Sequence, residues 1–192
     1  MEKLGKTKKK TINPRELALG GLFIALYIVG AYIKIPFPLV PITLQTLFVL
    51  LASLLLGPAL AVLSIAIYIF LGLAGIPVFS TGGGLHYILT PTFGYLLGFL
   101  LTAWVVGGLS KKRAFQSFFP LWLSSLLGLV LIYMCGISYL FLVVRPVYEG
   151  TNSLAGFFSL NFLITLVLDL FKSLLATLLA LKLRRILYVE YS

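Results

Sequence analysis

Charged residues are scarce in this sequence. Fifteen lysines and arginines and five aspartates and glutamates make up 10% of its 192 residues. A soluble domain normally has about 25% charged residues. Hydrophobic residues account for 60% of the chain, and one small core cannot bury that much apolar surface. The lack of charge therefore excludes an ordinary soluble domain and predicts a protein of the lipid bilayer.

Catalytic signatures are also missing. The sequence contains no GxxxxGK[ST] phosphate loop, so we expect no ATP hydrolysis by that route, and it contains no HExxH, GxSxG or Cys/His metal set. The one cysteine, Cys135, cannot form an internal disulfide, and we expect it to fill space in a helix contact. These absences predict a binding subunit, not an enzyme, with no metal or cofactor and with its energy supplied by another protein.

Six apolar runs predict an all-α membrane protein with six transmembrane helices. The runs cover residues 17–33, 42–56, 59–74, 92–109, 118–144 and 157–183. Before the first run, Asn13 suits an N-cap, Pro14 the first helical position and Glu16 the third. We interpret this run as a retained helix and not a cleaved signal peptide, because five runs follow it and no good Ala-x-Ala site appears.

Basic residues collect at particular places along the chain. They cluster in residues 3–15, 111–113 and 182–185, and each cluster adjoins an apolar run, so membrane topology explains them better than nucleic-acid binding. With six spans and both termini in the cytoplasm, the cytoplasmic segments contain twelve of the fifteen lysines and arginines. We therefore expect a basic cytoplasmic tail over residues 1–13 and one six-helix domain over residues 14–192, in the cell membrane.

The three predicted outer loops, residues 34–43, 75–91 and 145–156, are rich in proline, glycine, aromatics and hydroxyls. Long loops on a rigid scaffold commonly carry function, so we expect the functional face to be the outer one. The substrate-binding candidates there are Thr43, Gln45, Phe37, Phe79, Gly83, His86 and Tyr87. Gln45 can form a hydrogen bond either with a ligand or with another helix. Phe37 and Phe79 can form either an apolar lid over a ligand or part of an interfacial aromatic belt. Glycine permits close approach of the backbone to a ligand.

Asp169 and Lys172 lie inside the last apolar run, three residues apart and therefore on one helix face. On insertion scales each costs roughly 2.5–3.5 kcal/mol at the centre of a membrane helix. A surface pair at this spacing recovers only about 0.2–0.5 kcal/mol. Three roles remain open: a structural ion pair, a proton relay through Asp169, or a ligand site at which Lys172 meets an anionic group.

Small residues recur at four-residue spacing in three places. The pairs are Gly21 with Ala25, Gly94 with Gly98, and Ala176 with Ala180. This spacing lets helix backbones approach closely, either within the bundle or against another membrane protein.

Four stretches together resemble the BioY family, the biotin-specific substrate-binding S components of energy-coupling-factor (ECF) transporters. They are "PITLQTLFVLLASLLLGP" (41–58), "YIFLGLAGIPVFSTGGG" (68–84), "TPTFGYLLGF" (90–99) and "DLFKSLLA" (169–176). The resemblance implies a prokaryotic six-helix S component that binds biotin with high affinity near the outer face. It assigns Asp169 and Lys172 to the ligand. It also implies a transmembrane coupling protein and two ABC-type ATPases as partners, with Ala18, Gly21 and Ala25 as the docking face on the first helix.

The sequence departs from the family pattern in three places. The family usually has a glycine around Thr90 and Phe93, often has proline and glycine at residues 165–168, and has smaller residues at His86 and Tyr87. Biotin fits the charged pair, because Lys172 can neutralise its carboxylate while Asp169 accepts from the ureido N–H groups. In the alternative pose, Asp169 pairs with Lys172 and does not contact biotin itself. Two other functions stay open: an S component for another carboxylate vitamin such as lipoate, and a stand-alone proton-coupled transporter.

Overall fold

The computed structural model of the protein describes residues 13–36, 40–144 and 160–188. Phe37, most of the basic tail and the residues Arg145, Tyr148 and Asn152 of the predicted outer loop 145–156 lie outside the described residues. The predicted start of the last helix at residue 157 also lies outside them.

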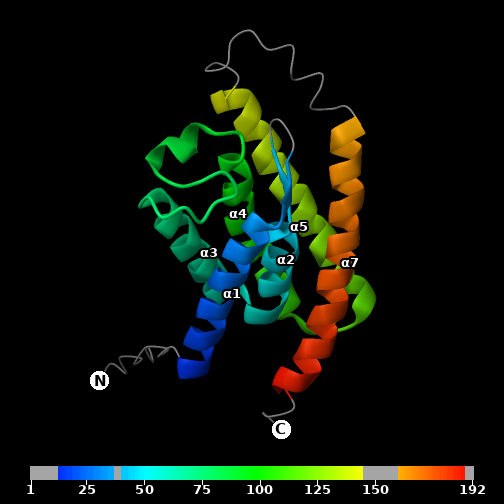
Figure 1. The fold of residues 1–192 in the computed structure, drawn as a ribbon. Coiled ribbons are helices and arrows are strands. Elements are labelled where there is room, and N and C mark those ends of the chain that lie inside the picture. Colours follow the sequence, from blue (N-terminus) through cyan, green and yellow to red (C-terminus); the bar gives the residue numbers. More distant parts are fainter. Residues whose placement is uncertain (1–12, 37–39, 145–159, 189–192) are drawn as a thin grey trace, which may run out of the picture.

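Six helices of 12 or more residues form a bundle in these ranges (Figure 1). They are α1 (Pro14–Tyr32), α2 (Gln45–Leu56), α3 (Pro58–Leu73), α4 (Phe93–Ser110), α5 (Phe118–Tyr139) and α7 (Leu160–Tyr188). A π turn, Leu140–Val144, continues α5, and short 3-10 helices cover Leu85–Leu89 and Arg113–Phe115. The prediction of a mostly helical protein is confirmed.

Four stretches in the described residues are long and apolar enough to cross a membrane. They are Pro14–Tyr32, Phe93–Ser110, Phe118–Leu142 and Leu163–Arg185. Helices α2 and α3 have 12 and 16 residues. At a rise of about 1.5 Å per residue, these lengths fall short of a hydrocarbon core about 30 Å thick. The six-span count therefore stays a prediction.

The predicted start of the second helix at Ile42 is wrong, because α2 begins at Gln45. Ile42 and Thr43 instead form strand β2 (Ile42–Thr43), which pairs antiparallel with β1 (Lys34–Ile35). Both residues are β-branched, which favours extended backbone, and they follow a segment rich in proline. The backbone N–H of Leu44 then donates to the carbonyl of Gly30, at 3.0 Å, so the hairpin is attached to the last turns of α1.

The start of α1 has the predicted capping box. Pro14 occupies the first turn, the Asn13 side chain accepts from first-turn backbone N–H groups, and the Glu16 carboxylate accepts from the Asn13 N–H at 3.2 Å. These contacts satisfy N–H groups that have no partner within the helix. The helix accordingly begins at Pro14, three residues before the predicted boundary.

The start of α1 and the end of α7 lie at one end of the bundle, which we call the terminus end (Figure 1). Arg184 holds this end together, because its guanidinium donates to the carbonyls of Leu54 at 2.6 Å and Ser110 at 2.9 Å. Those carbonyls belong to the last turns of α2 and α4, whose own helices leave them without N–H partners. The β hairpin and residues 75–91 lie at the opposite end, the loop end.

Two of the three small-residue pairs pack inside the bundle. A Cβ on Gly98 would lie 2.7 Å from the Ile132 Cα, and one on Gly94 would lie 3.1 Å from the Cys135 carbonyl, so these glycines let α4 approach α5. Ala176 and Ala180 are fully buried in α7. Cys135 is half-buried and adjoins Gly98, as expected for a residue in a helix contact.

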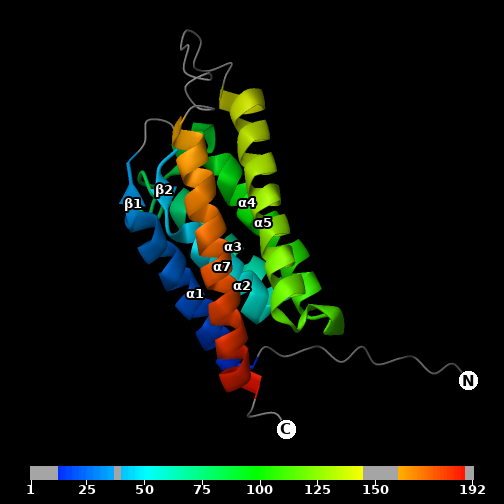
Figure 2. The same cartoon turned by 90° about the vertical axis from the view of Figure 1, so that its right-hand side faces the viewer.

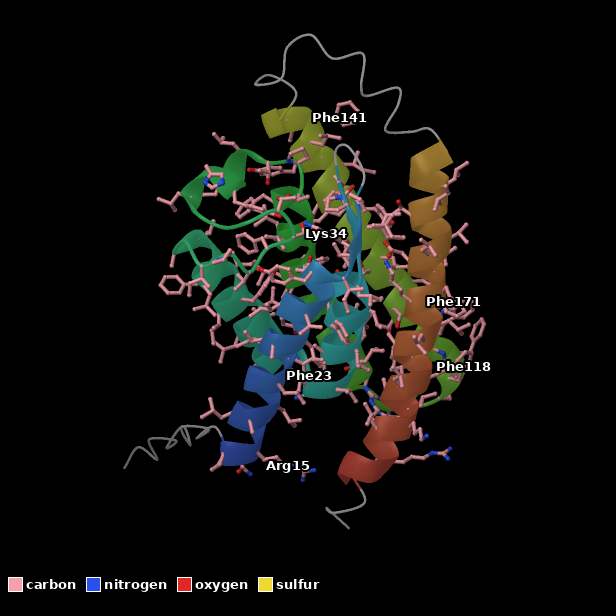
Figure 3. All side chains as sticks on the ribbon, viewed as in Figure 1. Arg15, Phe23, Lys34, Phe118, Phe141 and Phe171 are labelled. Atoms are coloured by element: carbon pink, nitrogen blue, oxygen red, sulfur yellow. The ribbon has the colours of Figure 1, made fainter. Side chains whose placement is uncertain are left out.

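Large apolar side chains cover the outside of the bundle. Phe171 is 66% exposed and, like Phe118, projects away from the bundle on the α7 side, whereas Phe23 is buried (Figure 3). Exposed apolar residues also occur on α3, α4 and α5, including Phe70, Trp104 and Met134. A surface of this kind is stable against lipid and unusual in water. In the side view, α7 runs the length of the bundle and packs against α2 and α5 (Figure 2).

Candidate ligand-binding site

Asp169 and Lys172 form a buried ion pair on α7. The Lys172 Nζ lies 2.7 Å from the Asp169 Oδ1, and the two residues are 5% and 8% exposed. Their separation of three residues places both side chains on one face of the helix. Both charges are therefore largely removed from water, and each needs further polar partners.

Each member of the pair has one more hydrogen-bond partner among the residues that the structure describes. The Tyr133 hydroxyl, from α5, donates to the Asp169 Oδ2 at 2.7 Å. Lys172 donates to the backbone carbonyl of Thr43, from β2, also at 2.7 Å. The pair consequently joins α5, α7 and the hairpin at the loop end. A carboxylate offers about four acceptor positions and an ammonium three donors, so both groups keep capacity to bind a ligand.

Thr43 and Gln45 connect this pair to the rest of the loop end. The Thr43 hydroxyl accepts from the Gln45 backbone N–H at 3.4 Å. The Gln45 side-chain amide donates to the Tyr68 hydroxyl at 2.6 Å, and Tyr68 donates in turn to the Val78 carbonyl at 3.1 Å. Gln45 therefore makes the interhelix hydrogen bond considered from the sequence, and through Tyr68 it holds the start of loop 75–91.

The aromatic residues of loop 75–91 pack inward. Phe79 and Tyr87 are 1% and 2% exposed, with ring centroids 4.3 Å apart, and the edge of Tyr68 meets Phe79 at 5.4 Å. The Tyr87 hydroxyl lies 3.3 Å from the Ser80 Oγ. These two predicted site residues thus form an aromatic cluster beneath the loop, separate from the hydrogen bonds of the charged pair.

Gly83 and His86 occupy different surroundings. A Cβ on Gly83 would lie 3.0 Å from the Gly72 carbonyl, so this glycine lets the loop pack on the end of α3. The neighbouring Gly84 has φ +105°, a conformation that favours glycine, and its N–H donates to the same carbonyl at 2.7 Å. His86 lies on the short 3-10 helix with its side chain exposed.

The predicted docking residues lie on the surface of α1. Ala18, Gly21 and Ala25 are all exposed, and a Cβ on Gly21 would meet no atom within 4 Å. Gly20 differs, because its Cβ would lie 3.3 Å from Leu60 of α3. The bundle itself therefore makes no close contact at Gly21.

Sequence reasoning missed three tyrosines. Tyr133 contacts Asp169, Tyr68 joins Gln45 to loop 75–91, and Tyr95 of α4 packs edge-on against Tyr133 with ring centroids 6.1 Å apart. All three lie within predicted apolar helices, where an aromatic residue is common and does not indicate a functional site. The hydroxyl groups could have indicated one, because a buried tyrosine hydroxyl usually has a polar partner.

An ion pair buried among apolar helices beneath hydrogen-bonded loops defines an integral membrane protein of the binding or transport class. Comparison with known proteins agrees. The model of the BioY family matches residues 6–188. The "Probable biotin transporter BioY" of Lysinibacillus sphaericus is 39% identical over 170 residues, covering 88% of this chain and 87% of the relative.

Two further relatives extend the match. The "Biotin transporter BioY" of Thermotoga maritima is 38% identical over 173 residues, covering 90% of this chain and 97% of the relative. Among solved structures, the crystal structure of the S-component for biotin from an ECF-type ABC transporter superposes with a TM-score of 0.76 at 25% identity. That match covers 89% of this chain and 91% of the solved one. The chain belongs to the BioY family.

Proposed function

We propose that this protein captures biotin with high affinity at the outer membrane face, as the substrate-specific S component of an ECF-type vitamin transporter. The observation that carries the proposal is the buried Asp169–Lys172 pair, joined to the loop-end hairpin through the Thr43 carbonyl, in a chain of the BioY family. Keeping two charges among apolar helices is costly, and a ligand with complementary polar groups offsets part of that cost.

Biotin offers the groups that this pair can bind. Its carboxylate can pair with Lys172, and its two ureido N–H groups can donate to the free acceptor positions of Asp169. Tyr133 and Lys172 already approach different oxygens of the carboxylate, which holds Asp169 in one orientation. Residues 34–43 and 75–91 then enclose the ligand from the loop end, with Thr43, Gln45, Phe37, Phe79, Gly83, His86 and Tyr87 as the candidate residues of that enclosure.

The proposed topology has six spans, with both termini in the cytoplasm of a prokaryotic cell. Its support is the distribution of charge at the two ends of the bundle. Residues 111–113 and Arg185 are lysines and arginines at the terminus end, whereas Lys34 is the one lysine or arginine of the loop end within the described residues. Cytoplasmic segments are enriched in lysine and arginine, so the loop end faces outward.

The proposed partners are a transmembrane coupling protein and two ABC-type ATPases. Two observations support them: the solved relative is an S-component from an ECF-type ABC transporter, and α1 has an open face at Ala18, Gly21 and Ala25. Small residues on a lipid-facing helix surface let a partner helix approach closely.

A ligand panel tests the proposed function. Purified protein titrated with biotin, desthiobiotin and lipoate should bind biotin tightly and keep measurable affinity for desthiobiotin, which retains the ureido ring. A preference for lipoate would assign the chain to another carboxylate vitamin. The chain alone in liposomes with a pH gradient should show no concentrative uptake, and uptake without any ATPase would instead indicate a proton-coupled transporter.

A further inference from the structure

The hydroxyl of Tyr95 has no hydrogen-bond partner in the described part of the chain. It differs in this from the other tyrosines whose side chains are described. Their hydroxyls are all bonded, in Tyr27, Tyr32, Tyr68, Tyr87, Tyr133 and Tyr139. No fully buried side-chain nitrogen or oxygen of these residues lacks a partner, so the Tyr95 oxygen is accessible and not sealed in the core.

Packing fixes the ring of Tyr95 close to the charged pair. The ring lies against Gly136 of α5, where an added Cβ would approach it to 2.6 Å. It also meets the Tyr133 ring at 83°. The hydroxyl of Tyr133 donates to the Asp169 carboxylate, so the Tyr95 ring lies one side chain away from the charged pair. One phenol is therefore used and the neighbouring one is left free.

The accessible hydroxyl of Tyr95 makes no protein hydrogen bond that would have to break before it binds a ligand. A hydroxyl donates one hydrogen bond and accepts others, and a ligand that excludes water from the site must supply such a partner. The ring is held by Gly136 and Tyr133, so little side-chain entropy remains to be lost when the hydroxyl binds a ligand.

We propose that Tyr95 contacts the ligand directly, donating its hydroxyl proton to the carbonyl oxygen of a cyclic urea whose N–H group donates to Asp169. Tyr133 is a positioning residue that orients the Asp169 carboxylate. Asp169 then accepts from the urea N–H group, and Tyr95 donates to the urea carbonyl oxygen. A carboxylate vitamin without a urea cannot form these two hydrogen bonds. This inference rests on the proposed function, and it places the ureido ring on the α4–α5 side of Asp169.

Substitution Tyr95→Phe tests the contact, because it removes one oxygen and keeps the ring packing. The dissociation constants of biotin and desthiobiotin should both rise by about 2- to 13-fold, the range expected for one neutral hydrogen bond. The melting temperature of the ligand-free protein should stay within error, because the Tyr95 hydroxyl makes no bond within the described chain. A purely structural role would lower the melting temperature instead.

The matched control is Tyr27→Phe, which removes a hydroxyl bonded to Ser64 at 3.1 Å, between α1 and α3. It should lower the melting temperature and leave the biotin dissociation constant within about twofold. If wild-type protein binds biotin and Tyr95→Phe binds it equally well, this inference is wrong and the proposed function stands. If wild-type protein binds no biotin, both are wrong.

Discussion

Lys172 and Thr43, 129 residues apart in the sequence, are joined by a 2.7 Å hydrogen bond from the ammonium group to the backbone carbonyl. The same ammonium group lies 2.7 Å from the Asp169 carboxylate. The charged residues of α7 and the hairpin at the loop end therefore form one connected structure. We therefore expect a ligand group that binds Lys172 to change the position of the hairpin.

The charged pair should contribute more to binding than to stability. Replacing only Asp169 by leucine leaves a buried ammonium group without its counter-ion, and breaking a buried pair in this way costs about 3–5 kcal/mol. The double substitution Asp169→Leu with Lys172→Met removes both charges and should recover most of the lost melting temperature. It should not recover biotin binding, measured by calorimetry. Normal biotin binding by the double variant would show that the Asp169–Lys172 pair does not contact the ligand.

Gln45 should act on loop 75–91 through Tyr68. Substitution Gln45→Leu removes the 2.6 Å hydrogen bond to the Tyr68 hydroxyl, at a cost of about 1 kcal/mol. Hydrogen exchange of the backbone amides in residues 75–84 should become faster, because Tyr68 also donates to the Val78 carbonyl.

The control for Gln45 is Thr46→Val. Thr46 is also buried in the first turn of α2, and its side chain makes no hydrogen bond in the described part of the chain. This control should leave the exchange rates unchanged. Equal exchange in Gln45→Leu and wild-type protein would show that the Gln45–Tyr68 contact does not restrain the loop.

Arg184 should stabilise the terminus end without affecting the ligand. Substitution Arg184→Ala removes the donor that joins the ends of α2 and α4. The Leu54 carbonyl loses its guanidinium donor, and the Ser110 carbonyl keeps only the longer bond from Gln116 Nε2 at 3.4 Å. The cost should be about 2–3 kcal/mol, since the donor is charged. The neighbouring Arg185→Ala removes the same charge from an exposed side chain and should cost little. Equal melting temperatures for the two variants would contradict the structure at this end.

Gly21 should be needed for assembly and not for folding. A leucine at this position enters open space, so the isolated Gly21→Leu protein should fold and bind biotin. It should lose copurification with the coupling protein, because the larger side chain keeps the partner helix away. Gly108→Leu on α4 is the matched control, since a Cβ there also meets nothing within 4 Å. Normal copurification of the Gly21→Leu protein with the coupling protein would show that Gly21 is not part of the docking face.

The helices could be predicted from the sequence because composition and hydrophobic run length determine them. The capping residues Asn13, Pro14 and Glu16 occupy the positions that the sequence predicted for them, whereas the apolar run placed the start of α1 three residues too late. The hairpin was not predicted. Ile42 and Thr43 lie just before α2, and in the sequence they continue the apolar run of that helix without a break. Their partners Lys34 and Ile35 lie across residues 36–41, a connection with three prolines that is longer than the loops that usually signal a hairpin.

The site was only partly predictable for a similar reason. Asp169 and Lys172 were evident because charge is rare in apolar helices. The partners Tyr133 and the Thr43 carbonyl come from α5 and β2, and sequence spacing does not reveal which side chain of one helix faces another. Phe79 and Gly83 were chosen as candidate ligand-binding residues from their residue types alone. Their inward packing depends on the path of the loop over α3, and the composition of the loop does not indicate that path.

Biotin titration of the Lys172→Ala protein by calorimetry tests the central claim most directly. Lys182→Ala, which removes an exposed lysine from the same helix, is the matched control. We predict that the biotin dissociation constant rises at least ~100-fold for Lys172→Ala, as expected when a buried partner of a charged group is removed, and stays within about twofold for Lys182→Ala. Unchanged biotin binding in a folded Lys172→Ala protein would contradict the claim that this buried charge binds the vitamin.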